Sequence, residues 1–201
     1  MDGARIILLA GPSGSGKTHL ARQSGLPVLE LDDFYRSGDD PLLPRDPALG
    51  IADWDDPASW DAEAAVEAIE EISRSGSAEV PIYDISRDVR VGSRRFETGP
   101  AGVFVGTGIF AAEIAGACSE RGLLADAIVV RRARWKNFLR RLWRDLREHR
   151  KPPLTVVRRG LALFREEPAV LARQTALGCR ALNRAATVAA LRACSSGATR
   201  R

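Results

Sequence analysis

The glycine-rich stretch GPSGSGKT at residues 11–18 constrains this chain more than any other segment. It follows the apolar run RIILLA at residues 5–10 and precedes THLARQSG, a sequence typical of a helix that ends at Gly25. The pattern G-x-x-x-x-G-K-[S/T] between a buried strand and a helix indicates a phosphate-binding loop. Its glycines let the backbone N–H groups approach the phosphates closely. We therefore expect this loop to bind a nucleoside triphosphate.

The polar positions of the loop have expected roles. Lys17 supplies a positive charge to the β- and γ-phosphates, and the hydroxyl of Thr18 is placed to bind Mg²⁺. The residues expected to bind the nucleotide are Gly11, Ser13, Gly14, Ser15, Gly16, Lys17 and Thr18. ATP and Mg²⁺ are therefore the predicted cofactors, and the sequence leaves the preference for ATP over GTP open.

Strand and helix patterns alternate along the first 130 residues. A helix is expected to start with Asp56 as N-cap and Pro57 in its first turn, and to end at Gly76. Further strands are predicted at 27–35, 78–85, 99–108 and 126–130, a short hairpin partner at 90–97, and a helix at about 109–121. This alternation is typical of a mostly parallel sheet covered on both faces. We predict an α/β fold of the P-loop NTPase class with a five-stranded sheet, in a single domain over residues 1–201.

From Arg131 onward the sequence reads as helix, interrupted by KPP at 151–153 and by Pro168. We predict a lid helix at about 133–151, which has an apolar stripe and an arginine-rich face. Extra C-terminal helices are predicted at about 154–194, so no closing strand is expected there.

Composition limits the partners. The net charge of +4 suits an anionic ligand without identifying one. Cys118, Cys179 and Cys194 lack metal-ligand spacing and read as reduced thiols of a cytoplasmic protein. The chain has no apolar stretch of membrane-spanning length, and no aromatics interleave on the basic face of 131–159. We expect a small-molecule partner, no nucleic acid and no membrane, and the sequence leaves a homo-oligomer open.

Two carboxylates are expected beside the phosphate loop. Asp32 and Asp33 close the predicted strand 27–35, and the carboxyl ends of parallel strands converge on the ligand. A carboxylate there can accept a hydrogen bond from a hydroxyl that approaches the γ-phosphate, or hold a magnesium-bound water. Asp32, Asp33 and Thr18 are therefore the predicted metal residues. The alternative is that both acids only cap a turn.

Five motifs together resemble the uridine kinase family of phosphate-loop kinases, relatives of phosphoribulokinase. They are GPSGSGKT, LDDFY, DWDDPASWD, VPIYDISRDVR and LRRLWRD, and the resemblance covers roughly residues 5–151. It implies that Asp32 is the base that receives the proton of a sugar 5′-hydroxyl, and that Asp55 grips ribose hydroxyls. It also implies that Tyr83 and Arg90 surround the nucleoside and that Arg141 and Arg144 are lid arginines that clamp phosphates.

The sequence departs from this family at three places. Thr107 stands where the family usually has a glutamate that helps to arrange magnesium. Ile85 and Asp88 stand where pyrimidine-specific members place an aromatic residue and a histidine. Since Asp88 accepts but cannot donate at neutral pH, it favours an amino-bearing or cationic acceptor. The lid's Arg-Gly-Arg is replaced by HRK at 149–151.

The expected function is an ATP-dependent kinase of a small hydroxyl compound, with a nucleoside as the leading acceptor. Two alternatives stay open. One is a kinase with a non-nucleoside acceptor, which the altered base pocket favours. The other is a nucleotide-binding regulator without catalysis, which the missing glutamate favours.

Overall fold

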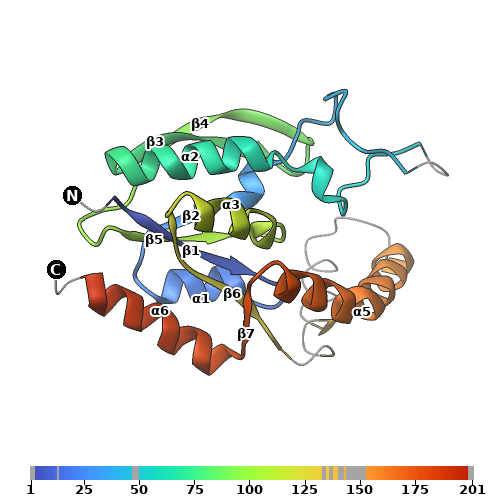
Figure 1. The fold of residues 1–201 in the computed structure, drawn as a ribbon. Coiled ribbons are helices and arrows are strands. Elements are labelled where there is room, and N and C mark those ends of the chain that lie inside the picture. The colour runs from blue at the N-terminus through green and yellow to red at the C-terminus, as the bar shows by residue number, and fades with distance from the viewer. Residues whose placement is uncertain are drawn as a thin grey trace.

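The computed structural model describes residues 3–12, 14–46, 50–132, 135, 138, 139, 143 and 153–198, with side chains in the last range described for 164–194. Its centre is a five-stranded sheet in the order β2-β5-β1-β6-β7 (Figure 1). The strands are β1 Arg5–Ala10, β2 Val28–Glu30, β5 Val103–Thr107, β6 Leu124–Val130 and β7 Arg180–Leu182. Every neighbouring pair is parallel, which confirms the predicted α/β fold.

The membership of the sheet differs from the prediction. The predicted strand 78–85 forms β3, Ser77–Asp84, which pairs antiparallel with β4, Val89–Glu97, in a separate two-stranded sheet. The fifth place is taken by β7, so the prediction of helices without a closing strand over 154–194 was wrong. β7 pairs three residues with the edge of β6, and so short a strand leaves no periodic pattern to detect.

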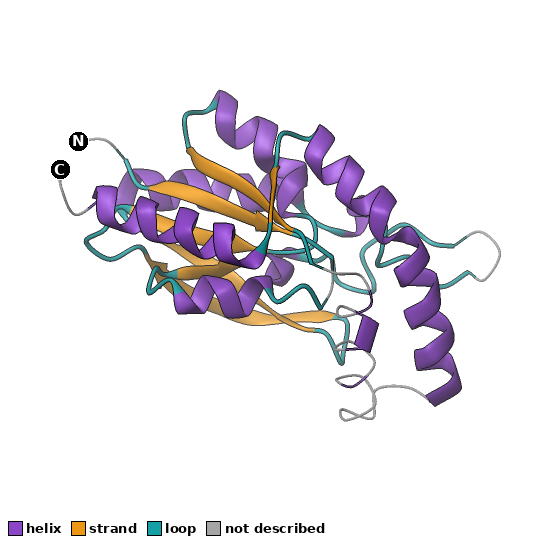
Figure 2. Ribbon diagram, turned by 90° about the horizontal axis from the view of Figure 1, so that it is seen from below, coloured by secondary structure: helices purple, strands orange, loops and turns teal. Residues whose placement is uncertain are grey.

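The central strand β1 alternates its side chains between two apolar cores. Ile6 and Leu8 join the core beneath α2 (Ala62–Ser75) and α3 (Ala115–Glu120). Ile7 and Leu9 join the core on the other face, beneath α1 (Lys17–Gln23) and α6 (Arg184–Ala198). Because successive strand residues point to opposite faces, a strand covered on both sides is apolar throughout. Figures 1 and 2 show the helices on either side of the strands.

The helix predicted to start at Asp56 begins later. Asp56 caps only a short 3-10 helix, Pro57–Ser59, through Ala58 N. The chain is then extended at Trp60, whose buried indole nitrogen donates to Leu31 O at 2.6 Å. Asp61 provides the N-cap of α2, accepting from Ala64 N at 3.1 Å. The contact between Trp60 and the end of β2 therefore separates the two helices.

Beyond β6, the chain differs from the prediction at Pro168. Helix α5 runs without interruption over Pro153–Ala176, with Pro168 inside it. A proline removes one backbone hydrogen bond, and here the helix continues through that loss. Most of the predicted lid helix 133–151 lies outside the described residues, but Phe138 packs against Phe164 of α5 with ring centroids 6.0 Å apart. Among the described helices, none is long and apolar enough to cross a membrane.

Gly106 marks a tight point in the core. An added Cβ there would lie 2.7 Å from Ile6 Cδ1 and 3.1 Å from Leu31 Cδ1, both in fully buried side chains. We expect Gly106→Ala to lower the free energy of unfolding by about 1–3 kcal/mol, measured by urea denaturation. Gly116→Ala is the matched control because that helical glycine has open space, and it should not destabilise the fold. Equal stability of both variants would contradict this packing.

Candidate active site

The phosphate loop has a backbone that favours glycine. Gly11, Gly14 and Gly16 have φ angles of 145°, 84° and 89°, which side chains rarely adopt. A Cβ at Gly11 would lie 3.1 Å from Ser15 Oγ and 3.3 Å from Val130 O, so the loop turns closely against the end of β6. Gly16 is the N-cap residue of α1, which begins at Lys17. Ser13 lies outside the described residues.

Two polar side chains of this loop are buried. Lys17 is 8% exposed, and its Nζ donates to Gly11 O at 3.2 Å, so the lysine folds back across the loop. Ser15 is 3% exposed, and within the described residues its Oγ has no hydrogen-bond partner. A buried hydroxyl without a partner is costly unless a ligand satisfies it. The residues present therefore fit a phosphate group bound in this loop.

Asp32 follows β2, and the phosphate loop follows β1, two places away in the sheet. Asp32 belongs to a 3-10 helix, Leu31–Phe34, and not to the strand end that the sequence suggested. Its Oδ1 accepts from Ile109 N at 3.1 Å, just after β5. β5 runs between β1 and β2, and Thr107 pairs in register with both Leu9 and Glu30. The buried Thr107 thus stands between the strand that leads to the loop and the strand that leads to Asp32.

Asp33 faces a different direction from its neighbour. Its Oδ1 accepts from Tyr83 N at 3.2 Å, and its Oδ2 lies 3.4 Å from the guanidinium of Arg94. Burial raises the pKa of the Asp33 carboxyl, against the lowering effects of these two partners. Both carboxylate oxygens are engaged by the β3–β4 hairpin. A metal role for Asp33 stays a prediction, and Asp32 is the stronger candidate of the two.

Aromatic rings gather beside Asp33. The ring of Tyr35 lies 5.8 Å from those of Trp54 and Tyr83, and 5.9 Å from that of Phe110. Trp54 and Tyr83 are themselves 6.4 Å apart. The Tyr83 hydroxyl donates to Arg36 O at 3.2 Å, and that of Tyr35 donates to Trp54 O at 3.3 Å. These rings form an apolar cluster. Tyr83 is the member of the cluster that the sequence predicted as a substrate-binding residue, so we call this the acceptor side of the site.

Tyr83 should ionise at a higher pH than an ordinary phenol. Burial, followed by the nearby Asp88 carboxylate, raises the pKa of Tyr83 to about 12. Since the folded pKa is raised, the neutral phenol stabilises the fold below about pH 10, and this contribution is lost as the pH rises through about 12. Ultraviolet titration should show an ionisation at about pH 12 that Tyr83→Phe removes. Two ionisations near pH 10 in the wild type would contradict this environment.

Asp55 and Asp88, the other predicted acceptor carboxylates, are both exposed. Asp55 N donates to Asp53 Oδ1 at 3.1 Å, and Asp55 follows Trp54 of the aromatic group directly. Asp88 has a φ of 53° in the hairpin turn, and its carbonyl accepts from Gly38 N at 2.7 Å. Among the described residues, the Asp88 carboxylate makes no hydrogen bond or ion pair. Asp88 is therefore electrostatically close to Tyr83, and Asp55 stays a predicted acceptor residue.

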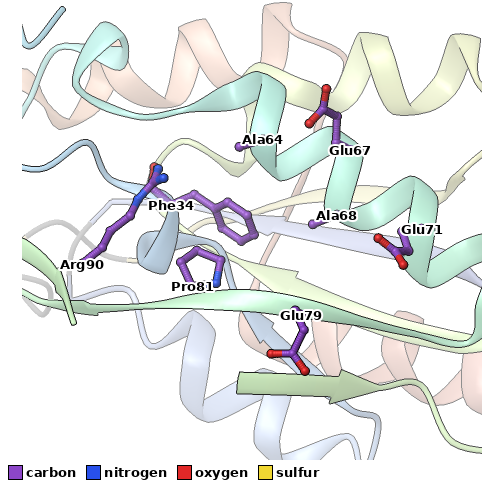
Figure 3. Close-up of a pocket in the computed structure, with 8 residues that line it drawn as sticks. All are labelled: Phe34, Ala64, Glu67, Ala68, Glu71, Glu79, Pro81 and Arg90. Atoms are coloured by element: carbon purple, nitrogen blue, oxygen red, sulfur yellow. The ribbon is translucent and has the colours of Figure 1, made fainter. Parts of the chain in front are cut away.

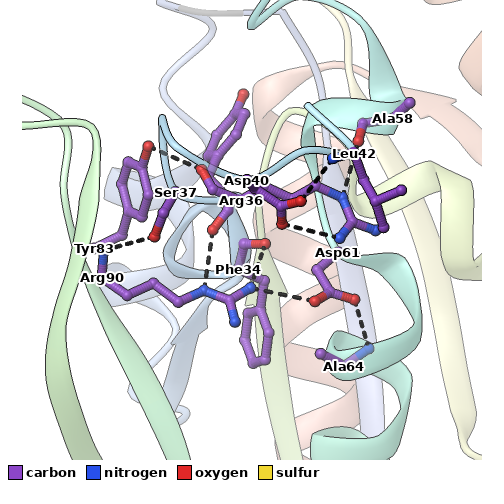
Figure 4. Close-up of polar contacts among 11 residues, drawn as sticks. Phe34, Arg36, Ser37, Asp40, Leu42, Ala58, Asp61, Ala64, Tyr83 and Arg90 are labelled. Atoms are coloured by element: carbon purple, nitrogen blue, oxygen red, sulfur yellow. Dashed lines mark hydrogen bonds and ion pairs between the residues drawn. The ribbon is translucent and has the colours of Figure 1, made fainter. Parts of the chain in front are cut away.

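Arg90 binds the protein's own backbone. Its Nε donates to Tyr35 O at 3.1 Å, and one terminal nitrogen lies 3.3 Å from both Phe34 O and Asp61 Oδ2. Figure 4 shows this guanidinium beside a second one, that of Arg36, which bonds Ala58 O and Asp40. The two arginines tie the segment after Asp33 to the start of α2. This geometry explains Arg90 structurally, and its contact with substrate stays a prediction.

A shallow pocket of about 260 Å³ lies between α2 and the hairpin (Figure 3). Its lining residues are Phe34, Ala64, Glu67, Ala68, Glu71, Glu79, Pro81 and Arg90. Arg90 alone among them is a predicted site residue, and none belongs to the phosphate loop. The predicted catalytic and acceptor groups therefore do not meet in this pocket.

Some site residues were missed or cannot be placed. Arg141 and Arg144, the predicted lid arginines, lie outside the described residues. Sequence reasoning missed Tyr35 and Trp54 as members of the aromatic group, although both stand in the motifs LDDFY and DWDDPASWD. Those motifs were the available signal. The sequence offers no such signal for Gln174, which donates a hydrogen bond to Ile109 O.

Comparison with known proteins supports the fold. No family model matches the sequence. A uridine kinase of Macrococcus caseolyticus is 28% identical over 172 residues, covering 82% of this chain and 80% of the relative. The inorganic pyrophosphatase TTM2 of Arabidopsis thaliana is 28% identical over 115 residues, covering 55% of this chain and 16% of the plant protein. This chain therefore spans only a small part of that second relative.

Solved structures with the same fold include kinases. A putative fructose transport system kinase from Silicibacter sp. TM1040 superposes with a TM-score of 0.63 at 21% identity, covering 86% of each chain. Phosphoribulokinase from Rhodobacter spheroides superposes with a TM-score of 0.55 at 16% identity, covering 88% of this chain and 68% of that one.

The parallel sheet, the phosphate loop and these likenesses define an α/β protein with the P-loop NTPase fold. Curated uridine kinases are among the proteins that this chain resembles, which confirms the resemblance that the sequence motifs predict, and the solved kinases share its fold.

Proposed function

We propose that this protein is an ATP-dependent kinase that transfers the γ-phosphoryl group to a hydroxyl of a small molecule. The observation that carries the proposal is the position of Asp32 relative to the phosphate loop. β5 separates the strands that lead to these two elements. Because neighbouring strands lie about 4.8 Å apart, the ends of β1 and β2 are about 10 Å apart. A terminal phosphoryl group and a hydroxyl in line with it fit across that span.

The loop residues hold the nucleotide in this proposal. Lys17 gives up its contact with Gly11 O to pair with the β- and γ-phosphates, and Ser15 Oγ gains a phosphate oxygen as its missing partner. The Thr18 hydroxyl is the group that would hold Mg²⁺ directly, and the Asp32 carboxylate would accept a hydrogen bond from a magnesium-bound water. The metal ion, when bound, neutralises charge on the transferring phosphate. Arg141 and Arg144 would add guanidinium donors to the same phosphates.

Asp32 has the role of proton acceptor. The acceptor's hydroxyl oxygen forms a bond to the γ-phosphorus while the bond from that phosphorus to the β–γ bridging oxygen breaks, which leaves ADP. The hydroxyl proton passes to Asp32 Oδ2, because Oδ1 is already bonded to Ile109 N. The carboxylate keeps its orientation through that backbone bond during the transfer.

A nucleoside is the leading acceptor. Asp55 would accept hydrogen bonds from sugar hydroxyls, and the rings of Tyr35, Trp54 and Tyr83 offer apolar surface for a base. The relative named uridine kinase supports this choice. Specific recognition of uracil has no support, since Ile85 and Asp88 replace the residues that the family uses there.

One observation favours a second candidate, a kinase whose acceptor carries an amino group. The Asp88 carboxylate is exposed and, in the described part of the chain, makes no hydrogen bond or ion pair. It lies near Tyr83, on the acceptor side. A cationic amine would satisfy this carboxylate and would also be attracted to the faces of the aromatic rings.

The test is an ADP-release assay with ATP and Mg²⁺ across nucleosides, sugars and amino alcohols, with thermal-shift measurements on the same panel. We expect one class of acceptor to raise ADP release above water hydrolysis and to raise the melting temperature. Nucleosides and amino alcohols separate the two candidates. ADP release at the hydrolysis background with every acceptor would count against a kinase.

The cytoplasmic location and the absence of nucleic-acid and membrane partners stay proposals. Cys118, Cys179 and Cys194 are all free thiols, and burial raises the pKa values of Cys118 and Cys179 to about 11. Unreactive reduced thiols support a reducing compartment.

A further inference from the structure

Gln174 reaches from the C-terminal region into the candidate active site. It lies in the last turns of α5 and is 4% exposed. Its Nε2 donates to Ile109 O at 2.9 Å, and within the described residues its Oε1 has no hydrogen-bond partner. A buried amide that makes only half of its hydrogen bonds is costly to keep. In the described part of the structure, the amide nitrogen of Gln174 is therefore the atom that is bonded, and the amide oxygen is not.

The hydrogen bond from Gln174 reaches Ile109, the same residue that bonds the Asp32 carboxylate. Ile109 accepts from Gln174 through its carbonyl and donates to Asp32 Oδ1 through its N–H, at 3.1 Å. The preceding residue is equally close, since a Cβ on Gly108 would lie 3.0 Å from the same Asp32 oxygen. Residues 108–109 thus set the position of the carboxylate. Gln174 in turn holds these residues through its hydrogen bond to the Ile109 carbonyl.

The backbone of Gln174 is itself held near the sheet. The neighbouring ion pair of Arg173 with Glu113, at 3.0 Å, lies on the surface and adds little to this. The carbonyl of Gln174 accepts from the buried Cys179 N at 3.2 Å, immediately before β7 joins the sheet. Gln174 is therefore connected to the residue before β7 on one side and to the residues after β5 on the other.

We propose that Gln174 is a positioning residue that holds the Asp32 carboxylate in place through Ile109. It touches neither nucleotide nor acceptor, and it acts by fixing the backbone amide that orients the proton acceptor. This inference rests on the proposed function because it assigns a purpose to Asp32. It also gives the C-terminal region, for which the sequence offered no role, a part in catalysis.

The first test replaces the donor. Gln174→Met keeps the length of the side chain and cannot donate to Ile109 O. We expect kcat to fall about 10- to 100-fold, because a small displacement of a catalytic group has effects of that size, while the KM for ATP stays within about twofold. Arg173→Met, on the same turn, removes only an ion pair whose arginine is 54% exposed, and it should keep kcat within about twofold. Equal kcat values in the two variants would overturn the proposal.

A double-mutant cycle separates positioning from general stability. In an Asp32→Asn background, Gln174→Met should cause little further loss, because the carboxylate that it positions is gone. The same fold-loss in both backgrounds would indicate a merely structural effect and would overturn the proposal. Full turnover by Asp32→Asn alone would instead overturn the proposed function, and this inference with it. Gln174→Leu, which also cannot donate to Ile109 O, serves as a second variant should Gln174→Met fold poorly.

Hydrogen exchange gives a readout that needs no acceptor. The amide of Ile109 should exchange faster in Gln174→Met than in the wild type, and at the wild-type rate in Arg173→Met. Unchanged exchange in Gln174→Met would overturn the inference while leaving the kinase proposal intact.

Discussion

Lys17→Met should lower the kcat/KM for ATP by about 100- to 1000-fold, because a preorganised donor to transferring phosphate is worth about that much. The lysine is 8% exposed and bonded within its own loop, so it needs only to exchange Gly11 O for a phosphate oxygen. Methionine has a similar length and removes the charge. The measurement is ADP release against ATP concentration, together with direct titration of nucleotide binding.

The control for Lys17 is on the same helix. Arg22→Met also removes one positive charge from α1, but Arg22 is 68% exposed and, in the described part of the chain, its ion pair is the surface contact with Glu30. We expect this variant to keep kcat/KM within about twofold. An equal loss in both variants would mean that general charge, and not the loop contact, matters.

Asp32→Asn should lower kcat by about 100- to 10,000-fold, because a carboxamide cannot take up the hydroxyl proton. The change keeps the side chain's shape and still allows an oxygen to accept from Ile109 N. The KM for the acceptor should change much less than kcat, which is the pattern of a group that acts in the transition state. Single-turnover measurement of the transfer step is the appropriate assay.

Two comparisons sharpen this result. Glu30→Gln makes the same chemical change at the end of β2, at an exposed residue that pairs with Arg22, and kcat should stay within about twofold. Asp33→Asn decides between the two adjacent acids. If it lowered kcat more than Asp32→Asn, the roles assigned to them would be reversed.

The parts that the sequence predicted best are those with strong local signals. The apolar run before the loop predicted β1, and the loop's glycines predicted its backbone, which has positive φ at Gly11, Gly14 and Gly16. The two-faced burial of β1 follows from its unbroken run of apolar residues. These features depend on neighbouring residues alone, so a single sequence is sufficient to predict them.

The errors occurred where distant contacts determine local structure. Trp60 interrupts the predicted helix because its indole reaches Leu31, 29 residues earlier. Strand β7 exists because the edge of β6 is available to pair with Arg180–Leu182. Its three residues carry no pattern of their own.

The candidate site shows the same division. The motifs predicted Asp32 and Tyr83 as site residues, and the structure brings Asp32 to the end of β5. The separate direction of Asp33 and the support from Gln174 depend on the hairpin and on α5. Neither is written in the spacing of residues along the chain. The prediction of one domain over 1–201, with a lid at 133–151, stays a prediction.

The most direct test of the central claim is to identify the product that receives the phosphoryl group. Wild-type protein is incubated with ATP, Mg²⁺ and the best acceptor from the panel, and phosphorus-31 NMR follows every phosphorus signal. The account predicts a phosphate monoester of the acceptor that accumulates in step with ADP. Inorganic phosphate as the sole product beside ADP, with every acceptor tried, would contradict it.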